Sequence, residues 1–236
     1  MIPKIIHYCW FGRNPLPELA LKCIESWKKF LPDYEIKEWN EDNIEFNFCS
    51  YVSEAYEMKK WAFVSDVVRL KVVYDYGGIY FDTDVEVIKS FDNLLNHTFF
   101  LGLESECRCN TGLGFGAEKG SLVIKEMLAQ YQNEHFILSD GSINKLVCPI
   151  YNTNALLKLG VIFNPGIISF MGGAIYPTEY FCPKNYFTGE LNITKNSYTV
   201  HHYDGSWQTR NQKVKHIIWK YFKFILQPVY NFIKGN

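Results

Sequence analysis

The alternation of apolar and polar positions in the first forty residues predicts a strand, a loop, a helix and a second strand. Residues 2–10 form an apolar run typical of a buried strand, and Pro15 and Pro17 mark the loop after it. Residues 19–30 carry apolar side chains at helical spacing, and residues 34–39 alternate as a strand does. This order predicts an α/β domain whose sheet is built with crossover helices.

Residues 53–76 have the pattern of one long helix that leads directly into a short strand. Phe63, Val67 and Leu70 lie on one helical stripe, and Gly77-Gly78 ends the pattern. The apolar run 79–81 is too short to be anything but a buried strand. Downstream, we expect strands at 98–103 and 113–117, a helix at 121–131, an ambiguous segment at 143–159 interrupted by Pro149, and loops with short strands at 161–198.

Size and composition indicate one globular domain with a buried core. The chain has 236 residues, of which 47% are hydrophobic and 17% aromatic. Tyr and Trp side chains can stack on sugars and nucleobases, although most aromatic side chains belong to the core. We expect Trp27, Trp39 and His7 to be core residues. The net charge of −1 provides no overall field to attract nucleic acid, so we expect no nucleic-acid partner.

The seven cysteines show no CxxC pair and no regular spacing. We therefore expect free thiols in a cytoplasmic setting rather than a zinc site or a disulfide framework. The N-terminal sequence does not resemble a signal peptide, and no stretch approaches the ~20 apolar residues needed to span a bilayer.

The tail at 213–236 differs from residues 1–212, which we expect to form a single domain. It combines aromatic and aliphatic residues with lysines and contains no acidic residue. A basic aromatic helix of this kind either lies in a membrane interface or packs on the domain, and Pro228 limits its length. The first alternative predicts peripheral contact with the inner face of the cytoplasmic membrane.

Two aspartates, Asp82 and Asp84, follow the short strand at 79–81. In an extended segment they point to the same side, where one is driven toward protonation unless a cation lies between them. Oxygen ligands without cysteine favour Mn²⁺ or Mg²⁺. The alternative is a solvated strand end, because Asp-x-Asp triplets are common by chance. A place at the carboxyl end of a strand, where open α/β sheets bind ligands, favours the metal site.

The preceding helix carries Asp66 and Arg69 three positions apart, and therefore on one face. Taken alone, the two residues are an intrahelical ion pair of little energetic value. Beside a metal site, the same pair is suited to hold ribose or sugar hydroxyl groups.

A series of short motifs runs through the first hundred residues and returns near the C-terminus. They are Ile2-Pro3-Lys4-Ile5-Ile6-His7 with Trp10-Phe11-Gly12, Ser26-Trp27, Leu31-Pro32-Asp33-Tyr34, Ala62 to Asp66 with Arg69, Tyr76-Gly77-Gly78-Ile79-Tyr80-Phe81-Asp82-Thr83-Asp84, and His201-His202 with Ser206-Trp207. Together they resemble glycosyltransferase family 32, which includes bacterial capsule and lipopolysaccharide transferases and yeast mannosyltransferases. This family is distantly similar to the clostridial toxin glucosyltransferases.

The resemblance implies a GT-A fold, in which a Rossmann-like mixed sheet is flanked by helices. It also implies a divalent metal, a nucleotide-sugar donor, expected to be UDP-linked, and retention of anomeric configuration. We expect the acceptor to be a glycan or lipid-linked glycan in surface polysaccharide synthesis. The identity of the acceptor is the part of the resemblance that carries over least well, because Thr153-Asn154-Ala155 stands where the family often has Thr-Gly-Pro. Front-face attack by the acceptor hydroxyl is preferred, because no second carboxylate is clearly placed as a nucleophile.

The resemblance also assigns residues to the donor. Trp10 is expected to stack on the nucleobase, and Asp66 and Arg69 to contact ribose and donor sugar. Asn110 either contacts the donor sugar or forms a structural turn.

Other residues are assigned to the metal and the diphosphate. Asp84 is expected to ligate the metal, Asp82 to touch ribose or a metal-bound water, and His202 to approach the metal or phosphates. Ser206 and Trp207 are expected to close over the diphosphate. The expected catalytic residues are Asp66, Arg69, Asp82 and Asp84.

Two other classes share part of this pattern. A haloacid dehalogenase-type phosphatase also places an apolar strand before Asp-x-Asp, but its motif requires Thr or Val where Glu86 stands, and it usually lies near the N-terminus. A non-catalytic carbohydrate-binding protein with structural Ca²⁺ needs neither the Asp66 and Arg69 pair nor Ser206-Trp207.

Overall fold

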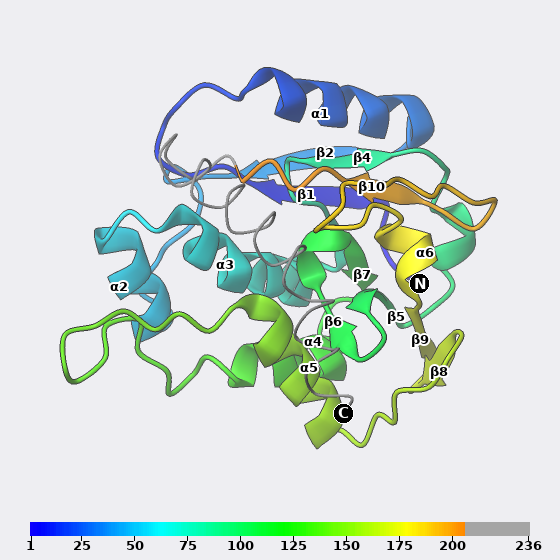
Figure 1. The fold of residues 1–236 in the computed structure, drawn as a ribbon. Helices are drawn as coiled ribbons and strands as arrows, with labels where there is room; N and C mark the ends of the chain where they lie inside the picture. Colours follow the sequence, from blue (N-terminus) through cyan, green and yellow to red (C-terminus); the bar gives the residue numbers. More distant parts are fainter. Residues whose placement is uncertain (206–236) are drawn as a thin grey trace, which may run out of the picture.

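The computed structural model describes residues 1–205, which form a central mixed sheet with helices on both faces (Figure 1). The strands are β1 (Ile5–Cys9), β2 (Glu35–Trp39), β3 (Gly78–Tyr80), β4 (Val85–Val87), β5 (Phe99–Ser105), β6 (Arg108–Cys109), β7 (Phe115–Ala117), β8 (Ile168–Phe170), β9 (Gly173–Tyr176) and β10 (Thr199–His201). The helices are α1 (Glu18–Phe30), α2 (Ser50–Glu57), α3 (Trp61–Tyr76), α4 (Leu122–Ala129), α5 (Cys148–Lys158) and α6 (Thr178–Phe181), with 3₁₀ turns η1 (Asp92–Leu94) and η2 (Thr111–Leu113).

The order of the strands places several carboxyl ends at one edge of the sheet. The order is β2-β1-β3-β7-β5-β9-β8, β6 pairs with β5, and β4 and β10 form a separate two-stranded sheet. β1 is parallel to β2 and β3, whereas β7 is antiparallel to both β3 and β5. β5 therefore runs in the same direction as β1 and β3. The carboxyl ends of these three strands face the side on which open α/β sheets bind ligands.

Each face of the sheet has its own apolar core. On one face, α2, α3, α4 and α5 cover the strands, and α1 lies along the opposite face with β4 and β10 (Figure 1). Trp27 is fully buried on the α1 side and Trp39 is buried on the other, so both are core residues as expected. The predicted α/β class, a mixed sheet flanked by helices, is confirmed.

Three features of the secondary structure differ from the sequence-based expectation. The single helix at 53–76 is divided into α2 and α3, because Lys59 has a φ of 55° and a right-handed helix cannot continue through that conformation. The ambiguous segment contains α5, which accommodates Pro149 in its first turn. β4 and β10, with three residues each, are too short for their alternation to be recognised.

The turn from α3 into β3 depends on glycine. Gly78 has a φ of 108°, and a Cβ atom there would lie 2.6 Å from the carbonyl oxygen of Ile5. Beside this turn, His7 is fully buried: its Nε2 lies 2.8 Å from the carbonyl oxygen of Gly77, and its Nδ1 accepts the indole N–H of Trp39 over 3.0 Å. Both contacts fit one neutral tautomer, so His7 is the satisfied core histidine that was expected.

The predicted tail at 213–236, and with it the boundary at 212, lies outside the described residues, as do Ser206 and Trp207. All seven cysteines lie within the described part, where none is paired in a disulfide. Across residues 1–205, no helix combines the length and the apolar character needed to cross a membrane.

Candidate functional site

A cleft of about 550 Å³ opens at the sheet edge where β1 and β3 end. Its lining combines aromatic and apolar residues with charged ones. The aromatic and apolar residues include Trp10, Phe11, Pro15, Pro17, Trp61 and Ala62. The charged and titratable residues include Asp66, Arg69, Asp82, Asp84, His201 and Asp204. The cleft thus offers a place for a flat apolar group next to a place for polar or ionic groups.

Asp82 and Asp84 belong to the tight link between β3 and β4. The amide of Val85 donates to the carbonyl oxygen of Asp82 over 3.0 Å, so the segment is a turn rather than the extended strand assumed from the sequence. α1 holds the far side of this link, because Trp27 Nε1 donates to the carbonyl oxygen of Val85 over 2.8 Å and Ser26 Oγ accepts from the amide of Val87 over 2.9 Å. The Ser26-Trp27 motif therefore fixes the strand that follows the two acids.

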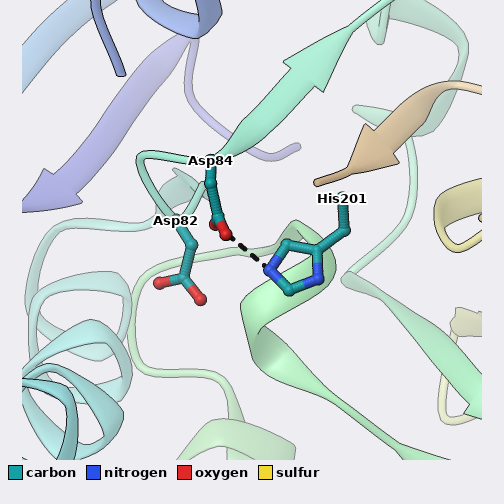
Figure 2. Close-up of side chains that lie close together, drawn as sticks. All are labelled: Asp82, Asp84 and His201. Carbon is teal, nitrogen blue, oxygen red and sulfur yellow. Dashed lines mark ion pairs between the residues drawn. The ribbon is translucent and has the colours of Figure 1, made fainter. Parts of the chain in front are cut away.

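The histidine that reaches the two acids is His201, not His202. His201 Nε2 lies 3.1 Å from Asp84 Oδ1, and Figure 2 shows the ring pointing from β10 toward both carboxylates. His202 lies 2.9 Å from Glu86 through its Nε2 and Oε2 atoms and does not join this group. Successive residues of a strand point to opposite sides, so the expectation for His202 was displaced by one position.

The pKa values of the two aspartates are shifted in opposite directions. Burial raises the pKa of Asp82 to about 6, with repulsion from Asp84 adding to the rise and Arg69 opposing it. Burial also opposes the ionisation of Asp84, but His201 and the amide of Asp204 outweigh it and lower the pKa of Asp84 to about 2. Repulsion from Asp84 thus contributes to the raised pKa of Asp82, although burial is the larger cause.

The same three side chains fit a divalent metal ion. One ligand atom from each of Asp82, Asp84 and His201 lies within 4.8 Å of the others. Two carboxylate oxygens and one imidazole nitrogen form a donor set that suits Mn²⁺. The Nε2 atom of His201 is the ring nitrogen that faces the two acids, whereas its buried Nδ1 atom, on the far side of the ring, has no hydrogen-bond partner among the described residues (Figure 2).

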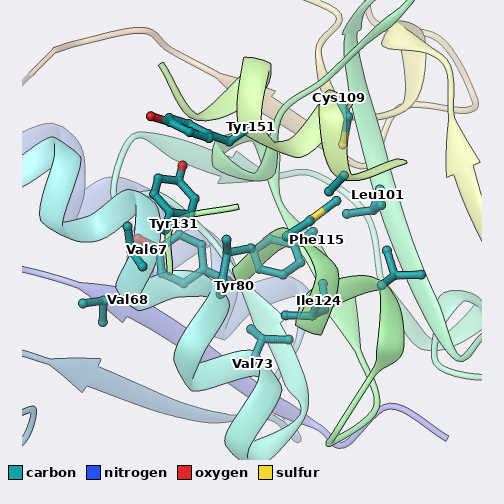
Figure 3. Close-up of a cluster of buried hydrophobic side chains, with 14 of the residues drawn as sticks. Val67, Val68, Val73, Tyr80, Leu101, Cys109, Phe115, Ile124, Tyr131 and Tyr151 are labelled. Atoms are coloured by element: carbon teal, nitrogen blue, oxygen red, sulfur yellow. The ribbon is translucent and has the colours of Figure 1, made fainter. Parts of the chain in front are cut away.

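Arg69 connects α3 to the first aspartate. Its Nη2 atom lies 3.0 Å from Asp66 Oδ1 and 3.0 Å from Asp82 Oδ1, and its side chain is only 4% exposed. α3 is itself fixed by Val67 and other apolar side chains that pack with Tyr80 in the core (Figure 3). The intrahelical ion pair of the alternative is thus present, but it is not isolated, because Arg69 also pairs with Asp82 in the cleft wall.

The remaining described candidates, Trp10 and Asn110, also line the cleft. Trp10 follows β1, and its indole N–H donates to the carbonyl oxygen of Asn14 over 2.6 Å, which fixes the ring. Asn110 Oδ1 accepts from the amide of Gly112 over 2.7 Å, so this residue forms the turn that was one of its two expected roles. The other role, contact with a donor sugar, stays a prediction.

Three further lining residues, Trp61, Cys148 and Tyr203, were not predicted from the sequence. Trp61 directly precedes the motif that begins at Ala62, and this neighbourhood was a usable signal. Cys148 lies in the ambiguous segment 143–159. Cys148 therefore gave no signal, whereas Tyr203 directly follows the His201-His202 motif, a neighbourhood that could have indicated it.

Comparison with known proteins supports the resemblance. Residues 17–101 match the family described as "Glycosyltransferase sugar-binding region containing DXD motif", so the predicted resemblance to DXD-containing glycosyltransferases is confirmed over that region. Inositol phosphoceramide mannosyltransferase 3 of Schizosaccharomyces pombe is 34% identical over 104 residues, covering 41% of this chain and 28% of that protein. Inositol phosphoceramide mannosyltransferase 1 of the same yeast is 29% identical over 111 residues, covering 42% and 33%.

A solved structure extends the likeness to most of the chain. A glycosyltransferase involved in the glycosylation of the major capsid of PBCV-1 superposes with a TM-score of 0.50 at 12% identity, covering 91% of this chain and 99% of that one. At this identity the likeness concerns the fold, and it confirms the expected GT-A arrangement. The matches to the family and to the two yeast relatives each cover less than half of this chain. The chain spans about a third or less of the length of the two yeast relatives.

Proposed function

We propose that this chain, which carries the sugar-binding region of DXD-containing glycosyltransferases, transfers a hexose from a nucleotide sugar in a metal-dependent reaction. The observation that carries the proposal is the cleft, whose lining includes both the cluster of Asp82, Asp84 and His201 and the side chain of Trp10. A nucleotide sugar has the matching groups: a flat base, a diphosphate that needs a cation, and a sugar.

Each part of the cleft has a task in this reaction. The face of Trp10 supplies an apolar surface for the base, and its N–H is already used within the protein. Asp82, Asp84 and His201 would hold the metal, which as a Lewis acid stabilises the charge on the departing diphosphate. Arg69, fixed by Asp66, keeps the Asp82 carboxylate in position and provides a buried positive charge near the reacting sugar.

We propose that the sugar keeps its anomeric configuration through front-face attack by the acceptor hydroxyl. A double displacement requires an available carboxylate as nucleophile. Asp66 and Asp82 both pair with Arg69, and Asp84 pairs with His201, so these three acids are engaged. The engagement of Asp82 by Arg69 and by the hydroxyl of Tyr80 also disfavours the phosphatase alternative, in which the first aspartate must attack the substrate.

The identities of donor and acceptor are proposed from different sources. A UDP-linked hexose and a surface polysaccharide acceptor follow from the resemblance, whereas the names of the two yeast relatives point to mannosyl transfer onto inositol phosphoceramide. Both sources are compatible with a lipid-linked acceptor. A peripheral position on the cytoplasmic face of the membrane, through residues 213–236, is proposed from the composition of that tail.

The decisive experiment is nucleotide release from UDP-glucose, UDP-galactose and GDP-mannose in the presence of Mn²⁺. Release of one nucleotide by the wild-type protein, lost in Asp84→Ala and retained in Glu86→Ala, is the expected result. Glu86 is a matched control because it lies two residues away and its side chain is 44% exposed. Binding of sugars without nucleotide release would favour a carbohydrate-binding protein, and hydrolysis of p-nitrophenyl phosphate alone would favour a phosphatase.

A further inference from the structure

Glu104 is an acidic residue near the cleft that has no role in the proposed reaction. It lies in the last part of β5, and β5 runs parallel to β1 and β3 across the antiparallel β7. Its carboxylate is therefore carried to the same edge of the sheet as the metal-site acids. The Glu104 side chain is 21% exposed. Among residues 1–205, Glu104 does not line the cleft, but its neighbour Asn110 does.

A hydrogen bond connects the two residues. Asn110 Nδ2 donates to Glu104 Oε2 over 2.8 Å, while Arg108 Nε lies 3.6 Å from the other carboxylate oxygen. Burial raises the pKa of Glu104, and the bond from Asn110 opposes that rise. The carboxylate itself does not line the cleft, but its hydrogen bond goes to Asn110, a side chain that does, and His201, another lining residue, interacts with it electrostatically.

The other bonds of Asn110 determine which way its amide points. Its Oδ1 atom accepts from the amide of Gly112 over 2.7 Å and from Cys148 Sγ over 3.7 Å. A side-chain amide has two N–H groups and one oxygen, so these contacts occupy the oxygen and one N–H. Among the bonds described for residues 1–205, none uses the second N–H, so Asn110, which lines the cleft, has a donor available.

The turn that carries Asn110 lies directly against the first metal-site acid. A Cβ atom at Gly112 would lie 2.6 Å from Asp82 Oδ2, 3.0 Å from Asn110 Oδ1 and 3.2 Å from Arg69 Nη1. The backbone therefore approaches these polar groups as closely as a glycine permits. A small displacement of the Asn110 amide changes which hydroxyl group can fit between it and the acids.

We propose that Glu104 is a positioning residue, which holds the Asn110 amide so that its remaining N–H meets a hydroxyl group of the donor sugar. The inference deepens the proposed function and rests on it. Glu104 acts through Asn110, and its carboxylate takes no proton from the acceptor. Its influence falls on recognition of the sugar, and the nucleotide is bound by other parts of the cleft.

The test compares Glu104→Ala, Glu104→Gln, Asn110→Ala and the double variant Glu104→Ala/Asn110→Ala, with Glu106→Ala as the control. Glu106 is an exposed acid in the same hairpin. Donor hydrolysis is measured with UDP-glucose or GDP-mannose, whichever the wild-type protein turns over with Mn²⁺, and binding is measured with the matching UDP or GDP. Thermal unfolding of each variant shows whether it is folded.

We expect Glu104→Ala to lower kcat/KM for the nucleotide sugar by about 10- to 100-fold while the Kd of the free diphosphate changes less than about twofold. Glu104→Gln retains an acceptor for Asn110 and is expected to restore most of the activity. The double variant is expected to be no worse than Asn110→Ala, because two residues that act as one unit are not additive.

Three results would overturn the inference while leaving the proposed function intact. They are unchanged kcat/KM in Glu104→Ala, additive losses in the double variant, and a Glu104→Gln variant as impaired as Glu104→Ala. The last result would assign the charge of Glu104 a direct part in the chemistry. A wild-type protein that turns over no nucleotide sugar would overturn the proposed function, and this inference with it.

Discussion

Asp84 directly precedes β4 and His201 ends β10, the strand that pairs with β4, and Nε2 of the histidine lies 3.1 Å from Oδ1 of the acid. The backbone reinforces this contact, because the amide of Asp204 donates to Asp84 Oδ2 and the amide of His202 to the Asp84 carbonyl oxygen, each over 2.9 Å. The segment that carries His201 is thus fastened to the second acid of the Asp-x-Asp motif at three points.

Replacing each of the adjacent histidines distinguishes the ligand set. His201→Ala is expected to weaken Mn²⁺ binding by at least about 10-fold, whereas His202→Ala, which loses only the contact with Glu86, should change it little. Isothermal titration with Mn²⁺ measures both, and removal of metal with EDTA should abolish nucleotide release. Equal effects of the two substitutions would contradict the assignment of His201.

Removing the guanidinium group of Arg69 should destabilise the fold as well as abolish activity. Arg69→Ala leaves Asp66 and Asp82 as carboxylates without their buried partner, which costs about 3–5 kcal/mol in the free energy of unfolding. Arg13→Ala is the control, because its ion pair with Asp42 is exposed and should contribute far less to stability. Urea denaturation compares the two, and equal losses would argue against the bridging role.

His7 should make stability depend on pH. Burial lowers the pKa of His7 to about 4, against 6.5 in the unfolded chain, so the unfolded state binds the proton more tightly. The free energy of unfolding is therefore unaffected by protonation of His7 above pH 6.5. As the pH falls from 6.5 toward 4, the free energy of unfolding decreases by about 3 kcal/mol. Urea denaturation from pH 4 to 7.5 should show a steeper decline for wild type than for His7→Gln, and parallel curves would contradict this.

Gly78 should tolerate substitution less well than Gly141, although both have a positive φ. A Cβ atom at Gly78 would lie 2.6 Å from the carbonyl oxygen of Ile5, whereas nothing lies within 4 Å of one at Gly141. Gly141→Ala should cost about 1–2 kcal/mol from backbone strain alone. Gly78→Ala should cost at least about 3 kcal/mol, because backbone must also move. Thermal unfolding of the two variants gives the comparison, and similar losses would show that the collision is relieved easily.

Much of the fold could be predicted because its larger elements bury periodic apolar stripes. α1, β1 and β2 lie close to the expected positions, and the Gly77-Gly78 turn has the predicted function. What was missed depends on tertiary context. The break at Lys59 has no proline or glycine to announce it, and β4 and β10 form only by pairing with each other across a long separation in the chain.

The candidate site divides in the same way. The acids that follow β3 and the Asp66 and Arg69 pair are local in sequence, so their spacing could be interpreted physically. The choice between His201 and His202 depends on which side chains at the end of β10 point toward the acids. A strand of three residues is too short for the sequence to show this. The link between Glu104 and Asn110 depends on the bulged pairing of β5 with β6, which only the structure shows.

The pairing of β10 with β4 also determines when the site can be completed during protein synthesis. Asp204 contacts Asp84 across 120 residues of chain, so the segment that fastens the second acid leaves the ribosome long after the Asp-x-Asp link. Until then the two aspartates lack the histidine and the closing amide, while α1, α3 and the first strands already have local partners with which to fold. A nascent chain that ends before residue 201 therefore lacks His201 and cannot assemble the full set of metal ligands.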